Sequence, residues 1–126
     1  MLTPVDTVKL FKSGPELQFE AGKVIFQSGA EESVMYGIVE GEVEMYLNGK
    51  LIETLKAEDV FGEGALLHSD HRRTSTAIAK TDCFLAPMDQ EHFLFAVQQT
   101  PMFAIEVMRS YSDRFRRIKD LFQALV

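Results

Sequence analysis

Residues 61–77 read FGEGALLHSDHRRTSTA and indicate how the rest of the chain is organised. They open with two glycines around one acid, followed by small and apolar residues that can begin a short helix. Glycines let backbone N–H groups approach an anion, and a helix N-terminus adds partial positive charge. Arg73 then offers a planar fork suited to phosphate oxygens, and Thr74 offers a hydroxyl donor. The stretch predicts a phosphate pocket in which Glu63 accepts hydrogen bonds from sugar hydroxyls, because an anion would repel its carboxylate.

The segments around this pocket have the pattern of short strands separated by glycine turns. Strands are expected at residues 17–20, 23–27, 34–40, 42–47, 50–55, 56–61, 74–79 and 83–88. Residues 42–47 alternate between polar and apolar side chains, as a half-buried antiparallel strand does. Asn48-Gly49 is the favoured two-residue hairpin turn. The spacing predicts a mainly β fold with flanking helices, a β-roll or jelly-roll-like barrel over residues 15–88.

Both halves of this pattern resemble the cyclic nucleotide-binding domain family, including its bacterial cAMP and cGMP sensors. The family's phosphate-binding cassette, roughly F-G-E-x-A-L, a loop and R-[TSA]-x, is similar to residues 61–77. Its earlier pattern of Gly, Phe, Gly and Met-Tyr-x-[IV]-x-x-Gly-x-Val is matched by Gly22, Phe26, Gly29 and residues 35–43. Gly37 departs from it, since a larger residue is usual there. The resemblance covers residues 11–123 and implies cAMP or cGMP as ligand and no cofactor.

The same resemblance assigns roles to the residues of the pocket. It implies backbone contacts to the ligand from Gly62, Gly64 and Ala65. Glu63 would accept a hydrogen bond from the ribose 2′-hydroxyl, and Arg73 and Thr74 would bind the cyclic phosphate. Thr74 could also bind guanine, so cGMP stays open, while the family's bacterial members favour cAMP. For residues 61–77 taken alone, the simpler alternative is a glycine turn followed by a surface loop with two arginines.

Composition narrows the class of protein. One cysteine, Cys83, lies in an apolar run, which predicts a packed core thiol rather than a reactive one and a reducing, cytoplasmic location. The N-terminus has no signal-peptide pattern and no segment is long and apolar enough to span a membrane. The net charge of −6 argues against binding of nucleic acid by this chain alone. We therefore expect one domain over residues 1–126.

Helices are expected at both ends of the barrel. One covers residues 3–12, within an N-terminal segment 1–13, and two lie within residues 89–126, the first capped by Asp89 and the second opened by Pro101. Apolar residues of the last helix recur at intervals of four and three, at Ala104, Met108, Tyr111, Phe115, Ile118, Phe122 and Leu125. This seam predicts a parallel homodimer through the C-terminal helix. The alternative is that the seam packs on its own barrel.

The last helix also resembles the helix that closes over the ligand in pacemaker-type channel domains. The run PMFAIEVMRSYSDRFRRI aligns with it without gaps. The alignment implies that Arg114 contacts the purine and that Ile118 packs on it as an apolar lid. The alternative for Arg114 is a solvated charge on the surface of the helix.

Other classes of function fit less well. A cupin-type enzyme needs clustered metal ligands, whereas His68 and His71 share one loop and His92 is expected on a helix. We therefore expect neither catalytic residues nor a metal. The sequence R-R-x-S at residues 72–75 also allows a kinase site as an alternative. The predicted function is a non-catalytic sensor that couples cyclic nucleotide occupancy to movement of its C-terminal helix, with an effector protein not yet identified. The alternative is the ligand-binding portion of a catabolite activator-type transcription regulator, without its helix-turn-helix.

Overall fold

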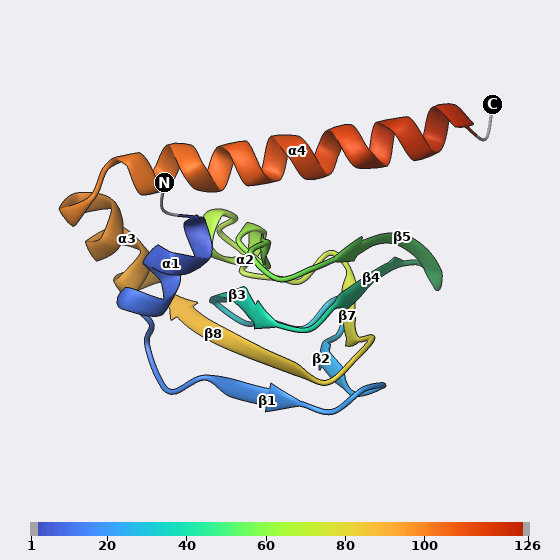
Figure 1. The fold of residues 1–126 in the computed structure, drawn as a ribbon, viewed down its shortest axis with the longest axis horizontal. Coiled ribbons are helices and arrows are strands. Elements are labelled where there is room, and N and C mark those ends of the chain that lie inside the picture. Colours follow the sequence, from blue (N-terminus) through green and yellow to red (C-terminus); the bar gives the residue numbers. More distant parts are fainter. Residues whose placement is uncertain (1–2, 125–126) are drawn as a thin grey trace.

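The structure is a computed structural model that describes residues 3–124 of the 126. Two four-stranded antiparallel sheets form a β-roll, and helices lie at one end of it and along its top (Figure 1). The first sheet contains, in spatial order, β1 (Leu17–Phe19), β8 (Cys83–Asp89), β3 (Val34–Glu40) and β6 (Val60–Phe61). The second contains β2 (Val24–Phe26), β7 (Thr76–Ala79), β4 (Val43–Leu47) and β5 (Lys50–Leu55). The helices are α1 (Pro4–Leu10), α2 (Gly64–Leu67), α3 (Gln90–Gln99) and α4 (Met102–Ala124).

Apolar side chains from both sheets meet inside the roll. Ile38 and Leu85 of the first sheet and Val43 of the second have no exposed surface, and they share one cluster. A second cluster lies under the helices, where Val8 of α1 and Phe103 of α4 are fully buried. Burial of apolar area on this scale is the main stabilising term for a domain of this size. The second cluster also ties the N-terminal helix and the start of α4 to the roll.

Local sequence signals explain most of the element boundaries. Thr3 caps α1 in a reciprocal capping box with Asp6, and the Asp89 carboxylate accepts from the backbone N–H of His92 at the start of α3. Asn48 and Gly49 both have positive φ, 52° and 78°, which is the geometry of the type I′ hairpin turn. The expected β-roll, hairpin and capped helices are therefore confirmed.

The segments that flank the pocket are less regular than expected. Only Val60–Phe61 of segment 56–61 is strand, because Glu58 has φ of 80° and the Asp59 carboxylate accepts from the backbone N–H of Lys56 at 3.0 Å, which closes a turn. The following strand begins at Thr76 rather than Thr74. The second correction leaves Arg73 and Thr74 in the loop that precedes β7, where backbone groups are free to face a ligand.

Cys83 is a core residue, as expected. It has no exposed surface, and its thiol donates to the carbonyl oxygens of Glu42 at 3.1 Å and Thr81 at 3.2 Å. Burial raises the pKa of the Cys83 thiol above its ordinary value. A raised pKa leaves little thiolate near neutral pH, so this cysteine is a packing residue.

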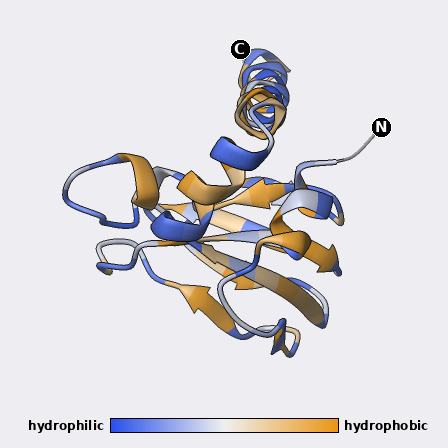
Figure 2. Cartoon of the chain, turned by 90° about the vertical axis from the view of Figure 1, so that its left-hand side faces the viewer, coloured by the Kyte–Doolittle hydropathy of each residue, from blue (hydrophilic) through white to orange (hydrophobic). Residues whose placement is uncertain are grey.

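The long helix α4 lies along the roll and turns different faces toward it and away from it (Figure 1). Phe103, Val107 and Arg114 are its buried residues. The predicted seam is largely exposed, with Phe115 at 56% and Phe122 at 67%. Figure 2 looks roughly along α4 and shows hydrophobic residues on it as well as on the strands below. Met108, Phe115 and Phe122 of the seam therefore do not pack on the barrel, whereas Tyr111 and Ile118 line a cavity between α4 and the roll. The last member of the seam, Leu125, lies outside the described residues. None of the helices described between residues 3 and 124 is both long and apolar enough to cross a membrane.

Candidate ligand site

One cavity of about 340 Å³ lies between the cassette, the strands β4 and β5, and α4. This volume is within the range of small-molecule sites. All eight residues predicted from the sequence line it: Gly62, Glu63, Gly64, Ala65, Arg73, Thr74, Arg114 and Ile118. The fold thus brings Arg114 and Ile118, near the end of the chain, to a loop some fifty residues earlier.

The start of the cassette requires glycine at position 62. Gly62 has φ of 82°, and a Cβ added to it would lie 2.7 Å from Arg73 Nη1. Gly64 opens the single-turn helix α2, and the backbone N–H of Ala65 donates to the carbonyl of Gly62 at 3.3 Å. His71, with φ of 53°, closes the loop by a 2.7 Å contact between its Nδ1 and the carbonyl oxygen of Ala65. The loop is held by its own backbone, so its amides are preorganised.

Arg73 is buried beneath the cassette, with 4% of its surface exposed. Its Nη1 donates to the carbonyl of Gly62 at 2.8 Å, and its Nη2 donates to the carbonyl of Val34 and lies 3.5 Å from Glu32. The guanidinium carbon stacks 4.0 Å from the centre of the Phe26 ring. Burial lowers the pKa of Arg73, although the Glu32 carboxylate acts in the opposite direction. Arg73 therefore supports the cassette as well as supplying it with positive charge.

Arg114 is a buried ion-pair residue rather than a solvated surface charge. It reaches from α4 to two carboxylates of the roll, Glu53 on β5 and Glu63 in the cassette. Glu53 accepts from Nε at 3.0 Å and from Nη2 at 2.8 Å, while Nη1 donates to Glu63 at 3.4 Å and to the carbonyl of Val60 at 3.1 Å. Burial alone would lower the pKa of Arg114, but the hydrogen bonds and charges of both carboxylates outweigh it and raise the pKa.

Two polar atoms of residues that line this cavity have no hydrogen-bond partner. They are Glu63 Oε2 and Arg73 Nε. Within residues 3–124, every other buried side-chain nitrogen or oxygen atom has a hydrogen-bond partner. Buried polar groups are nearly always hydrogen-bonded, so an unpaired one calls for a ligand, a water or a function. One is an acceptor for a hydroxyl group and the other is a donor for an anion. Burial also raises the pKa of Glu63, while the Arg114 charge opposes this shift.

Nine further residues line the cavity that sequence reasoning did not select: Phe26, Met45, Leu47, Ile52, Glu53, His68, Arg72, Ser75 and Tyr111. Glu53 is the most consequential of them because it holds Arg114. It lies opposite Met45 in the β4–β5 register, and both residues line the cavity. The pairing of Glu53 with Arg114, 61 positions later, could not be predicted from the pattern of the sequence.

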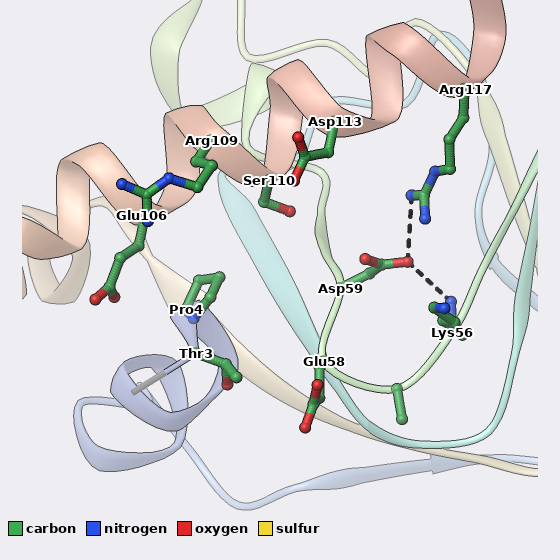
Figure 3. Close-up of a pocket in the computed structure, with 11 residues that line it drawn as sticks. Thr3, Pro4, Lys56, Glu58, Asp59, Glu106, Arg109, Ser110, Asp113 and Arg117 are labelled. Carbon is green, nitrogen blue, oxygen red and sulfur yellow. Dashed lines mark hydrogen bonds and ion pairs between the residues drawn. The ribbon is translucent and has the colours of Figure 1, made fainter. Parts of the chain in front are cut away.

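A second cavity, of about 310 Å³, lies between the start of α1, the β5–β6 turn and α4 (Figure 3). Its lining carries charges of both signs, from Lys56, Arg109, Arg117, Glu58, Asp59, Glu106 and Asp113. Arg117 points into this second cavity and pairs with Asp59 at 3.4 Å. Its neighbour in the helix, Ile118, lines the first cavity instead. This pair is a second tie between α4 and the roll. Residues 3–124 contain no group of three side chains suited to a metal ion.

Comparison with known proteins bears on this arrangement. The family model of the cyclic nucleotide-binding domain matches residues 16–100. The chain belongs to the cyclic nucleotide-binding domain family. Among solved structures, the Thermus thermophilus catabolite activator protein has the same fold, with a TM-score of 0.75 and 23% identity over 97% of this chain and 58% of that one. A structure described as "A cyclic-GMP-dependent signalling pathway regulates bacterial phytopathogenesis" has a TM-score of 0.73 and 25% identity, over 88% of this chain and 89% of that one.

Curated relatives of this cyclic nucleotide-binding domain are much longer proteins. A cAMP-dependent protein kinase regulatory subunit from Schizosaccharomyces pombe is 35% identical over 74% of this chain and 23% of its own length. A cGMP-dependent protein kinase from Eimeria tenella is 29% identical over 95% of this chain and 12% of its own length. The chain thus spans less than a quarter of the length of either relative.

Proposed function

We propose that this domain is a non-catalytic sensor that binds cAMP or cGMP in the cavity between the cassette and α4. The observation that carries the proposal is the pair of unpaired buried atoms, an acceptor on Glu63 and a donor on Arg73. A cyclic nucleotide carries a ribose hydroxyl, which could donate to Glu63 Oε2, and an anionic phosphate, which could accept from Arg73 Nε. We assign the 2′-hydroxyl to Glu63 and the cyclic phosphate to Arg73, Thr74 and the backbone of residues 62–65.

The base would occupy the opposite end of the cavity. Ile118 and Tyr111 from α4 and Ile52 from β5 provide apolar surface there. Arg114 borders that surface, with its guanidinium carbon 5.5 Å from the centre of the Tyr111 ring. An apolar slot with few polar groups binds either purine, and relatives include both a cAMP-dependent and a cGMP-dependent protein. We retain cAMP as the preferred ligand and treat cGMP as its competitor.

Calorimetry with cAMP and cGMP tests this function directly. We expect a dissociation constant in the micromolar range or below for at least one of them, and a weaker one for the second. Thermal unfolding should shift upward with ligand concentration, because a ligand that binds only the folded state stabilises it. Absence of binding at millimolar nucleotide, with protein that unfolds cooperatively, would refute the proposal. A tenfold preference for cGMP would overturn cAMP as the preferred ligand.

We also propose that occupancy is passed to α4 and from there to a second copy of the chain. α4 joins the cavity through Arg114 and Ile118. Away from the cavity it exposes Met108, Phe115 and Phe122, which follow one another at intervals of seven residues. Apolar residues that recur at this spacing on an exposed helix favour a coiled-coil partner. The partner that fits is the same helix of a parallel homodimer.

Light scattering tests this dimer. We expect the mass of two chains for the wild type and of one chain for the variant Phe115→Glu/Phe122→Glu, because charges in the seam oppose its burial. Arg116→Glu, at an exposed position of the same helix, is the control and should stay dimeric. A wild type that stays monomeric over a 100-fold range of protein concentration, about 1 to 100 µM, would remove the dimer from the proposal. The proposal of nucleotide binding would be unaffected.

The alternative function, the ligand-binding portion of a transcription regulator, predicts the same ligands. The fold shared with the catabolite activator protein keeps this alternative open. The length of the native reading frame distinguishes it from a free-standing sensor. The cytoplasmic location and an effector protein downstream of α4 stay predictions.

A further inference from the structure

Arg114 is shared unequally between its two carboxylates. Glu53 occupies Nε and Nη2 with two hydrogen bonds of 3.0 and 2.8 Å, whereas Glu63 has one longer contact of 3.4 Å with Nη1. Both carboxylates are buried, with 8% and 4% of their side chains exposed. A guanidinium has two forks that can each fill a carboxylate with two parallel hydrogen bonds, Nε with Nη2 and Nη1 with Nη2. Glu53 takes the first, and in the second Nη1 also donates to the carbonyl of Val60 at 3.1 Å. The fork that Glu53 fills is therefore not available to Glu63.

This unequal sharing explains why Glu63 has an unpaired oxygen. Glu63 Oε1 faces Nη1 of Arg114, while Oε2 is buried without a partner in the described part of the chain. Two opposite charges left alone in a buried site would be expected to form the bidentate pair, since it satisfies both oxygens. The second carboxylate, Glu53, is what draws the fork of Arg114 to the strand β5 instead.

We propose that Glu53 is a positioning residue that holds Arg114 away from Glu63 Oε2 and so leaves this oxygen without a protein partner, as an acceptor for the ribose 2′-hydroxyl. The inference rests on the proposed function, and it adds the residue on which recognition of the ribose depends. Without the Glu53 carboxylate, Arg114 turns to Glu63 and fills both of its oxygens. A ribose hydroxyl must then compete with a charge-assisted pair, and the domain no longer distinguishes ribose from 2′-deoxyribose.

The test compares cAMP with 2′-deoxy-cAMP in the wild type and in Glu53→Gln. A hydrogen bond to a charged acceptor changes a dissociation constant by roughly tenfold or more, so the wild type should prefer cAMP by about that factor. In Glu53→Gln the preference should fall to about threefold or less, with little change for 2′-deoxy-cAMP. A general loosening of the site would weaken both ligands alike and leave their ratio unchanged, so the ratio isolates the positioning role.

Two variants sharpen the comparison. Glu44→Gln on the neighbouring strand β4 removes a carboxylate that bonds the Tyr46 hydroxyl at 3.3 Å and does not line the cavity, so it should keep the wild-type ratio. Glu63→Ala should abolish the preference by itself, and adding Glu53→Gln to it should have no further effect on the ratio. If Glu53→Gln does not fold, Glu53→Asp keeps the charge but withdraws the carboxylate by one methylene, and should also lower the ratio.

The outcomes separate the two proposals. A wild type that binds neither cAMP nor cGMP refutes the proposed function. A wild type that prefers cAMP over 2′-deoxy-cAMP, together with a folded Glu53→Gln that keeps the full preference, overturns the role of Glu53 and leaves the proposed function in place.

Discussion

Replacing Arg73 with alanine is expected to weaken nucleotide binding by about 30-fold to several thousand-fold, which corresponds to roughly 2–5 kcal/mol for a buried charge-assisted contact. Arg73 is the buried cation of the cassette, and its Nε has no partner within residues 3–124. Arg73→Lys keeps the charge but loses the planar fork and the stacking on Phe26, so it should recover only part of the affinity. Calorimetry with cAMP measures both variants.

The same substitution should also destabilise the fold. Arg73 donates to the carbonyl groups of Val34 and Gly62, and both lose a partner in Arg73→Ala. Buried carbonyl groups left unsatisfied cost about 1–3 kcal/mol, which a domain with the usual 5–15 kcal/mol tolerates. Arg116→Ala, at an exposed position of α4 that does not line the cavity, is the control and should lose much less in both measurements. Binding by Arg73→Ala within threefold of the wild type would contradict the cassette assignment.

Replacing Arg114 with alanine is expected to lower the free energy of unfolding by on the order of 3–5 kcal/mol at neutral pH. The change leaves Glu53 and Glu63, both buried, without the cation that they share. It also removes one of the ion-pair contacts between α4 and the roll, and leaves the pair of Arg117 and Asp59. Urea unfolding measures the loss, and Arg116→Ala, at an exposed position of the same helix, should be nearly neutral.

The loss in Arg114→Ala should depend on pH. Burial raises the pKa of Glu63 above its ordinary value of 4.5, and Arg114 opposes this shift. A carboxyl group whose pKa is raised by folding stabilises the folded state below its ordinary pKa, and that contribution disappears as the pH rises through the raised value. Without Arg114 the pKa of Glu63 rises further, so the variant should lose most at pH 7 and regain much of its stability near pH 4.5. A loss independent of pH would show that Arg114 acts through packing alone.

Arg114→Ala also tests coupling between the site and α4. A ligand shifts a conformational equilibrium only by its different affinity for the two states. We expect the variant to bind nucleotide more weakly than the wild type, though less so than Arg73→Ala, and to lose the response of α4 to occupancy. Distances between spin labels on α4 and on the roll, measured with and without cAMP, report that response. A wild-type response in Arg114→Ala would exclude the coupling role.

The sequence by itself determined the β-roll, its turns and the residues of the cassette. These features depend on neighbours in the chain: Asn48-Gly49 and Gly62 sit where φ is positive, Thr3 and Asp89 cap helices, and residues 42–47 alternate between two faces. The physics of a turn or a cap is complete within a few residues, so the pattern of residues is sufficient to predict it.

The tertiary structure alone decided how the charges of the site are paired. Glu53 and Arg114 are 61 residues apart, and Arg73 and Val34 are 39 apart, so no local pattern joins them. It also decided which side of α4 faces the roll, since both sides of the helix are apolar enough to be buried. A buried charge is tolerated only where a specific partner is brought to it, and that depends on the packing of the whole chain rather than on its local sequence.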